Sequence, residues 1–305
     1  MNVLSKAYIA GFFDGEGSVN IIHQKARGED QKHKDTHFIT TSLANTNRQV
    51  LEKVQEIYGG NIAESKPNGN RKVGYRLHLT RRKAELFLKD ISPFLLLKRS
   101  QVLIGLKSRE TIRKGNYCGR SEVLSEKVLQ DRSKMENEIK RLNQSHIDKL
   151  ICDIPEESKI EYLAGFFDGE GSVSILKPLP KVHRLFVSIS SVDKGIIEWI
   201  KFNAEDIGWI TKRTHDNENW SDSWKWQVSD EKAFDFLKLI QPYIIIKQKQ
   251  IEVAEEFRKT ILPSQGLHFG SKRGSGNVKN PVTEELEFYR DELQTQMNIL
   301  NKRGI

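Results

Sequence analysis

The chain has 305 residues, about twice the length of a common single domain, so we expect two domains. Hydrophobic residues make up 37% and charged residues 30% of the sequence, a globular balance that excludes disorder throughout the chain. The formal net charge of +8 favours a polyanionic partner such as a nucleic acid, because Lys and Arg bound to phosphates release condensed counterions.

Apolar residues recur at helical spacing in some segments and alternate with polar residues in others, and these two patterns predict helices and strands. A turn signal at 68–70 (Asn-Gly-Asn) separates two of the strands. In chain order, the elements predicted for the first half are a helix over 8–17, strands over 18–24 and 37–44, a helix over 47–58, strands over 61–66 and 73–80, a helix over 82–88, and a further helix with Pro93 in its first turn.

The second half repeats this order after a charged linker that contains one predicted helix, near 125–143. Its elements are a helix over 162–171, strands over 172–176 and 185–191, a helix over 194–207, strands over 209–214 and 223–229, a helix over 231–239, and a further helix from Pro242. A flexible connector at 270–276 then leads to a helix over 282–301 that resembles the linker helix in sequence. We therefore divide the chain into an N-terminal repeat (1–108), a charged helical linker (109–157), a C-terminal repeat (158–262), and a basic connector with a C-terminal helix (263–305).

The cysteines and apolar runs indicate the cellular setting. Cys118 and Cys152 form no CxxC pair and no Cys/His cluster with zinc-ligand spacing, so a reducing interior is expected rather than a disulfide framework. Residues 1–6 open no signal peptide, and the longest apolar runs, such as 94–97 and 243–246, are far shorter than the ~20 residues that span a bilayer. We expect an intracellular protein with no membrane partner, located wherever its nucleic acid lies.

Two blocks of the sequence occur twice, which indicates an internal duplication. Residues 8–19 read YIAGFFDGEGSV and residues 162–173 read YLAGFFDGEGSV, with a single difference. Residues 93–101 (PFLLLKRSQ) and 242–250 (PYIIIKQKQ) both spell proline, an aromatic residue, three aliphatic residues, lysine, two others and glutamine. Each half is therefore predicted to have the order α-β-β-α-β-β-α.

The repeated block is predicted to be a helix that contacts its own second copy. Gly11 and Gly15 stand four residues apart, on one face of the helix. Because a glycine inside a helix costs ~1 kcal/mol relative to alanine, two glycines in both copies indicate close contact between two backbones. The simplest partners are Gly165 and Gly169 of the second copy.

This contact would bring Glu16 and Glu170 together at the C-terminal ends of two touching helices. Like charges repel there, and carboxylates at a helix C-terminus oppose the helix dipole. Divalent cations between the carboxylates would reverse this penalty, and such ions suit phosphodiester hydrolysis. A single Asp-Gly-Glu-Gly is more often a turn, but two copies inside a helical block favour a functional pair. Asp14 and Asp168 are interpreted as capping or packing residues rather than as catalytic ones.

The doubled block resembles the LAGLIDADG motif of homing endonucleases, with residues 9–17 and 163–171 as the two copies. The resemblance covers roughly residues 5–108 and 158–260. It implies an α+β fold of two tandem pseudo-symmetric repeats, each with a curved four-stranded antiparallel sheet, packed through the two motif helices. The implied activity is cleavage of both strands of a long asymmetric double-stranded DNA site with 3′ overhangs, promoting intron or intein mobility. The alternatives are an intron RNA maturase and a catalytically silent DNA-binding protein of the same fold.

The resemblance also implies a metal site. It assigns metal binding to Glu16 and Glu170, helped by the backbone carbonyls of Gly15 and Gly169. Many family members carry Asp in place of Glu, a departure that leaves the chemistry possible and shifts the metal positions. Mg²⁺ is the expected ion, Mn²⁺ is expected to substitute, and Ca²⁺ is expected to support binding without cleavage.

Other catalytic residues follow from the same resemblance. Lys98 and Lys247 match lysines that lie in the family's active sites, near the start of the last helix. They would polarise the attacking water or stabilise charge on the phosphate; the alternative is that they end aliphatic runs at the surface. Asn45 and Ser191 lie near a position where the family often has a polar residue that positions water.

The strands offer polar side chains on alternate positions, which could read bases in a DNA groove or simply face solvent. The candidates for base contacts are Ser18, Asn20, Gln24, Thr40, Ser42, Arg76 and His78 in the first half, and Ser172, Ser174, Ser188, Ser190, Lys225 and Gln227 in the second. The candidates for phosphate contacts are Lys66, Arg71, Lys72, Lys212 and Arg213. All five tryptophans lie in the second half, so the recognition surface and its DNA site are expected to be asymmetric. The expected partner is double-stranded DNA, with host intron RNA as the alternative, and a monomer needs no protein partner because the duplication supplies both halves.

Overall fold

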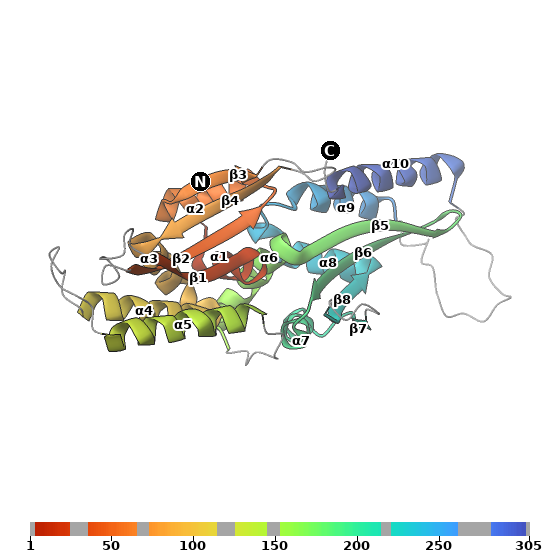
Figure 1. The fold of residues 1–305 in the computed structure, drawn as a ribbon. Coiled ribbons are helices and arrows are strands. Elements are labelled where there is room, and N and C mark those ends of the chain that lie inside the picture. Colours follow the sequence, from red (N-terminus) through yellow and green to blue (C-terminus); the bar gives the residue numbers. More distant parts are fainter. Residues whose placement is uncertain are drawn as a thin grey trace.

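The computed structural model describes residues 4–24, 36–65, 73–114, 126–144, 153–214, 221–261 and 282–302, and contains two halves of the same topology (Figure 1). The first half consists of α1 (Lys6–Glu16), β1 (Gly17–Gln24), β2 (Thr36–Asn45), α2 (Arg48–Tyr58), β3 (Asn61–Ser65), β4 (Gly74–Thr80), α3 (Arg81–Ile91) and α4 (Arg99–Lys114). The second half consists of α6 (Lys159–Glu170), β5 (Gly171–Leu179), β6 (Val182–Ser191), α7 (Lys194–Asn203), β7 (Trp209–Arg213), β8 (Ser223–Ser229), α8 (Asp230–Ile240) and α9 (Gln248–Lys259). Two further helices are α5 (Glu126–Gln144) and α10 (Glu284–Asn301).

Each half contains one four-stranded antiparallel sheet. The strand orders are β1-β2-β4-β3 and β5-β6-β8-β7, so the two sheets have equivalent topologies. Alternate residues of β1 and β4 are buried under the helices, as Val19 and Ile21 are in β1 and Leu77 and Leu79 are in β4. The α+β fold predicted from the doubled sequence is therefore confirmed.

The motif helices α1 and α6 lie against each other at the centre of the molecule (Figure 1). A Cβ atom added to Gly11 would lie 2.0 Å from the backbone oxygen of Tyr162, and one added to Gly165 would lie 2.0 Å from the backbone oxygen of Tyr8. No side chain fits at either position, so the backbones themselves are in contact. The predicted glycine-mediated contact between the two copies is confirmed.

The phenylalanines of the motif divide between the core of each half and the helix contact. Phe13 packs edge-on against Phe87 in its own half, with ring centroids 5.5 Å apart. A Cβ on Gly169 would meet the ring of Phe12 at 3.9 Å, so Phe12 contacts the opposite motif helix. The contact between the halves is therefore lined by aromatic rings as well as by glycines.

The helices predicted to begin at Pro93 and Pro242 begin later. Each proline lies in a short 3₁₀ turn, Ser92–Phe94 or Gln241–Tyr243, after which the backbone becomes extended. The α-helices start only at Arg99 and Gln248. The aliphatic runs between turn and helix are thus irregular segments, because their N–H groups bond to a carboxylate and not to helix carbonyls, as described below.

The predicted helix over 194–207 is shorter than expected and ends at Asn203. Glu205 and Asp206 follow with φ angles of 56° and 55°, and Gly208 has φ 79°. These left-handed residues reverse the chain direction before β7, which a continuous helix could not do.

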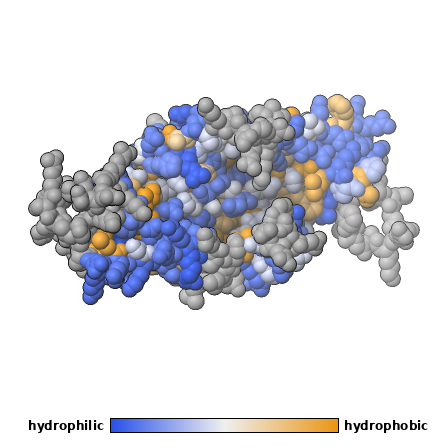
Figure 2. All heavy atoms as spheres, in the orientation of Figure 1, coloured by the Kyte–Doolittle hydropathy of each residue, from blue (hydrophilic) through white to orange (hydrophobic). Residues whose placement is uncertain are grey.

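Helices α5 and α10 are a second pair of equivalent elements, and each packs on its own half (Figure 1). Asn143 of α5 donates to the backbone oxygen of Val19 at 3.1 Å, and Asn301 of α10 donates to that of Val173 at 2.6 Å. The buried guanidinium of Arg132 in α5 donates to Thr111 of α4 at 3.1 Å. The visible surface over α5 is mainly hydrophilic (Figure 2). The duplication predicted for the appended helix is thus confirmed, and both copies pack on the core.

The predicted N-terminal repeat ends at residue 108, within α4, which continues to Lys114. Among the described residues, no helix is long and apolar enough to cross a membrane.

Candidate active site

Glu16 and Glu170 end the two motif helices and converge across the contact. A Cβ added to Gly15 would meet the Cγ of Glu170 at 3.2 Å, and one added to Gly169 would meet the Cγ of Glu16 at 3.2 Å. Each glutamate therefore lies over the glycine that precedes its counterpart. The close approach at Gly11 and Gly165 produces this arrangement, because it holds both helix ends side by side.

The surroundings of the two glutamates differ. The side-chain amide of Asn45 donates to Glu16 Oε1 at 2.9 Å, and its oxygen accepts from the Asn47 N–H at 2.8 Å. Ser191, at the matching end of β6, accepts the Asp193 N–H at 3.1 Å. Glu16 is half-buried and Glu170 is exposed. The site is thus pseudo-symmetric in backbone and asymmetric in side chains.

Burial and a like charge disfavour the ionised form of Glu16. Burial, and then the nearby Glu170, raise the pKa of Glu16 to about 7, while Asn45 and the two lysines oppose this rise. Burial also lowers the pKa of Lys247, although Asp168, Glu16 and Glu170 oppose that shift. A cation placed between the glutamates would favour their ionised forms.

The donor set fits a hard divalent cation. The converging groups are the two carboxylates, with the carbonyls of Gly15 and Gly169 one residue before them. All of these donors are oxygens, which Mg²⁺, Mn²⁺ and Ca²⁺ prefer. The small volume of the two glycines leaves space that any side chain would fill.

A cavity of about 470 Å³ opens beside Glu170. Its lining includes Gly15 and Lys98 from the first half and Glu170, Ser190 and Ser191 from the second. Residues from both repeats therefore line one shared cavity, and either half alone lacks part of its lining.

The ammonium groups of both lysines lie at the ends of the motif helices, and Lys98 also lines the cavity. Lys98 Nζ donates to the backbone oxygens of Phe13, Asp14 and Gly15 at 3.0, 2.6 and 3.2 Å. Lys247 Nζ donates to the backbone oxygen of Asp168 at 2.5 Å. These carbonyls end the motif helices, where cations complement the helix dipole. The interpretation of the lysines as surface ends of aliphatic runs is therefore wrong.

Asp14 and Asp168 bind the backbone of the segments that carry the lysines. Asp14 accepts the N–H groups of Leu96, Leu97 and Lys98 at 2.8, 3.0 and 2.8 Å. Asp168 accepts the equivalent three N–H groups in the second half at 2.8, 3.0 and 3.1 Å. Each aspartate thus holds the start of a helix in place and carries the adjacent lysine into the site, which confirms its predicted capping role.

Two buried tyrosines connect these aspartates across the molecule. Tyr8 Oη donates to Asp168 at 2.6 Å, and Tyr162 Oη donates to Asp14 at 2.7 Å. Burial, and then the neighbouring aspartate, hold the pKa of each tyrosine well above 10, so both remain hydrogen-bond donors. The sequence analysis missed both tyrosines, although their identity in both copies of the block was a usable signal.

Tyr162→Phe is expected to lower the free energy of unfolding by about 1–3 kcal/mol, because a buried carboxylate loses one of its donors. Urea unfolding of the purified protein measures this change. Tyr58→Phe is a matched control, because the Tyr58 hydroxyl donates to the more exposed Asp90 at 3.2 Å. Equal losses of unfolding free energy for the two variants would contradict a special role for the hydrogen bond between Tyr162 and Asp14.

The structure places most candidates for base contacts on one face of each sheet. In the first sheet, Ser18, Ser42 and His78 are aligned by register, and the hydroxyls of Ser18 and Ser42 are 2.9 Å apart. Side chains two residues apart in a strand lie on the same face of the sheet, and this places four more candidates on this face: Asn20, Gln24, Thr40 and Arg76. In the second sheet, the aligned set is Ser172 with Ser188 and Gln227, and Ser190 with Lys225; Ser174 shares this face.

The candidates for phosphate contacts do not share one face of a sheet. Lys212 pairs with Trp224 in the register, on the opposite face from Lys225, and forms an ion pair with Asp222 at 2.7 Å. Arg213 pairs with Ser223 at the end of β7. Lys66, Arg71 and Lys72 lie outside the described residues.

Comparisons with known proteins agree with this geometry. A family model described as LAGLIDADG endonuclease matches residues 9–101, and one described as LAGLIDADG-like domain matches residues 157–256. No curated protein sequence matches the chain.

Several solved structures share the fold. The LAGLIDADG homing endonuclease I-GzeII in complex with its DNA target has a TM-score of 0.70 at 17% identity, covering 98% of this chain and 100% of that one. I-LtrWI bound to target DNA has a TM-score of 0.66 at 19% identity, with 98% of each chain covered. I-SmaMI bound to uncleaved DNA in the presence of calcium ions has a TM-score of 0.64 at 17% identity, covering 97% of this chain and 99% of that one.

The two family matches lie in tandem, together cover more than half of the sequence, and each contains one motif helix and one sheet. The chain therefore belongs to the LAGLIDADG endonuclease family and carries both copies of the family's fold in a single polypeptide.

Proposed function

We propose that this protein is a divalent-metal-dependent endonuclease that cuts both strands of a long, asymmetric double-stranded DNA site. The products would carry 3′ overhangs, and the break would promote the mobility of an intron or intein. The observation that carries the proposal is the convergence of Glu16 and Glu170 at the ends of two helices in direct backbone contact. A protein selected for stability alone would not bring two carboxylates together in this position.

In this proposal Glu16 and Glu170, with the carbonyls of Gly15 and Gly169, hold Mg²⁺, and Mn²⁺ can replace it. The bound ions supply a polarised phosphate and a more acidic water. Asn45 holds one oxygen of Glu16 and so directs the other toward the centre of the site. Lys98 and Lys247 stand at the helix ends, where an ammonium group can polarise the attacking water or stabilise charge on the phosphate.

The polar faces of the two sheets are proposed to read the DNA in its major groove. The aligned sets differ between the halves: the first contains Arg76 and His78, and the second contains Lys225 and Gln227. Two different faces suit a non-palindromic target, and a single chain can place both of them on one duplex. Support comes from I-GzeII and I-LtrWI, which share the fold and are bound to DNA targets.

The proposal is tested by capturing DNA from a randomised duplex library in Ca²⁺, followed by a switch to Mg²⁺. The wild type and a Glu16→Gln/Glu170→Gln double variant are compared side by side. Duplexes that both proteins capture, and that only the wild type cuts on both strands, would support it. Sequencing of the cut ends then reveals the overhang.

Two other results would redirect the assignment. Specific capture without cleavage by the wild type would indicate a catalytically silent DNA-binding protein. Failure to enrich any duplex would contradict the proposal and make structured intron RNA the next ligand to test.

A further inference from the structure

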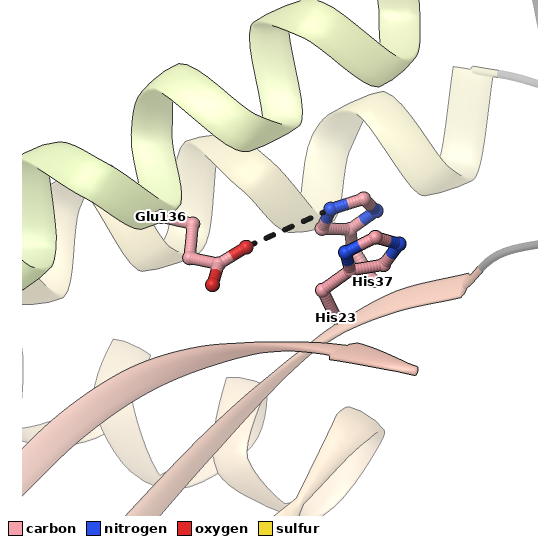
Figure 3. A group of neighbouring side chains, drawn as sticks. All are labelled: His23, His37 and Glu136. Atoms are coloured by element: carbon pink, nitrogen blue, oxygen red, sulfur yellow. Dashed lines mark ion pairs between the residues drawn. The ribbon is translucent and has the colours of Figure 1, made fainter. Parts of the chain in front are cut away.

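Three side chains meet where helix α5 crosses the first sheet, away from the glutamate pair (Figure 3). His23 of β1 and His37 of β2 are direct partners in the strand register, and their rings stack with centroids 4.3 Å apart and planes 4° apart. Glu136 of α5 points toward them, and its Oε2 lies 3.8 Å from His37 Nε2. Each residue offers one ligand atom, and these atoms all lie within 4.8 Å of one another.

The second half has an equivalent cluster with different chemistry. Lys177 Nζ lies 2.7 Å from Asp291 and 2.9 Å from Glu287, both on α10. His183 of β6 is 2.7 Å from the same Asp291. An ammonium group and an imidazole on the sheet thus bind carboxylates on the appended helix.

The strand positions of the two clusters correspond, whereas the acids do not: with Asn143 matched to Asn301, Glu136 corresponds to Gln294. Lys177 follows Val173 by four residues, as His23 follows Val19, and the two valines bind equivalent asparagines of α10 and α5. His183 precedes Leu185 by two residues, as His37 precedes Ile39, and these residues pair with equivalent positions of β5 and β1. A histidine therefore replaces the lysine that supplies the positive charge in the second half.

We propose that a bound metal ion takes the place of this lysine between the strands and the appended helix, and that His23, His37 and Glu136 form a structural site for Zn²⁺ or a similar late transition metal. Two imidazoles and one carboxylate, with water as a fourth ligand, are a donor set that Zn²⁺ accepts. The ligand bonds would be about 2.0–2.2 Å long. Because the lone pair of an imidazole nitrogen lies in the plane of its ring, the two rings must tilt out of their present parallel stack to bind one ion. Nitrogen donors distinguish this site from the all-oxygen site at the glutamate pair, which favours Mg²⁺.

The burial and surroundings of the cluster suit a structural ion. The side chain of His37 is 2% exposed and that of Glu136 is 15% exposed, so a metal bound there is largely shielded from water. Lys140 forms an ion pair with Glu136 Oε1 at 2.6 Å, which leaves Oε2 directed at the imidazoles. The ion would fasten α5 to β1 and β2, as the salt bridges of Lys177 fasten α10 to the second sheet.

The test uses ZnCl₂ alone as the probe. The full chain is prepared with Glu16→Gln/Glu170→Gln to remove the other carboxylate pair, is freed of metal with a chelator, and is titrated in a calorimeter. We expect one equivalent of Zn²⁺ to bind in the presence of excess Mg²⁺ and the melting temperature to rise by several degrees. His23→Gln in this background should lose that equivalent and the thermal shift, while the matched variant His183→Gln should retain both.

The outcomes separate metal binding from folding and from nuclease function. Each variant is first compared without metal by circular dichroism, and Glu136→Gln serves as a second variant should His23→Gln fail to fold. Co²⁺ provides an independent readout, since visible absorption typical of a four-coordinate ion should appear with His23 present and disappear without it. Unchanged zinc stoichiometry in both the His23→Gln and the Glu136→Gln proteins, or no binding to the parent protein, would overturn the proposal. None of these readouts depends on DNA cleavage.

Discussion

Gly11→Ala is expected to lower the free energy of unfolding by more than about 4 kcal/mol, among the largest losses seen for single substitutions. The added Cβ would lie 2.0 Å from the backbone oxygen of Tyr162 and 2.9 Å from the backbone nitrogen of Phe166. Backbone atoms inside a helix cannot move away as a flexible side chain can, so the two motif helices must separate. Helix propensity favours alanine by only ~1 kcal/mol and cannot offset this.

Chemical unfolding monitored by circular dichroism measures the effect, and Gly15→Ala is the matched control. At Gly15 the nearest atom to an added Cβ is the Cγ of Glu170, at 3.2 Å, and that side chain can move. Gly165→Ala should reproduce the loss, because its contact with Tyr8 is equivalent. Similar stabilities for Gly11→Ala and Gly15→Ala would show that the contact at Gly11 is not as tight as the geometry indicates.

Glu16→Gln is expected to act in opposite directions on stability and on cleavage. Without metal, the folded protein holds the pKa of Glu16 at about 7, above its ordinary value of 4.5. The folded state therefore keeps a proton that the unfolded state releases, and the stability contributed by this group falls as the pH rises from about 4.5 to about 7. Glutamine cannot ionise, so the variant should be more stable than the wild type by about 1–3 kcal/mol at pH 8 and by little at pH 4.5.

Urea unfolding in a chelating buffer at both pH values measures this difference. Glu198→Gln, at an exposed ion pair with Lys194, is a suitable control and should show no comparable gain. A Glu16→Gln protein that is less stable than the wild type at pH 8 would mean that the carboxylate stabilises the fold without metal.

The same substitution should reduce cleavage by roughly 10²–10³-fold or more, the size of effect seen when one group is removed from a preorganised site. Gel assays that separate nicked from fully cut DNA, run at saturating protein, distinguish slower chemistry from weaker binding. Glu170→Gln should also impair cleavage. If Glu16→Gln and Glu170→Gln leave different DNA strands uncut, the difference would reflect the asymmetry created by Asn45 and Ser191. Full double-strand cleavage by Glu16→Gln would remove this residue from the mechanism.

Much of the fold could be predicted from local patterns. The doubled block, the glycines four residues apart and the alternation of strand residues are short-range signals, and each predicts one structural feature. Small residues on one helix face require a close neighbour, so the contact of α1 with α6 and the meeting of Glu16 with Glu170 followed from the sequence. The succession of helices and strands also followed from the sequence, whereas the order of the strands within each sheet was seen only in the tertiary structure.

The side-chain partners could not be predicted, because they are distant in the sequence. The hydrogen bond of Tyr8 with Asp168 joins residues 160 positions apart, and the segment bound by Asp14 begins 82 positions after it. No local pattern encodes such pairs, and the same lysine pattern was compatible with a surface position until Lys98 was seen at the end of α1.

The asymmetry of the two halves has the same origin. Asn45 and Ser191 occupy matching strand ends, yet the asparagine amide donates to Glu16 while the serine hydroxyl accepts the N–H of Asp193. His23, His37 and Glu136 carry no motif spacing, and only the packing of α5 across β1 and β2 brings them together. Repetition in the sequence therefore established the scaffold and its paired acids, while the tertiary structure decided which side chains surround them, because contacts between elements depend on packing that no single segment contains.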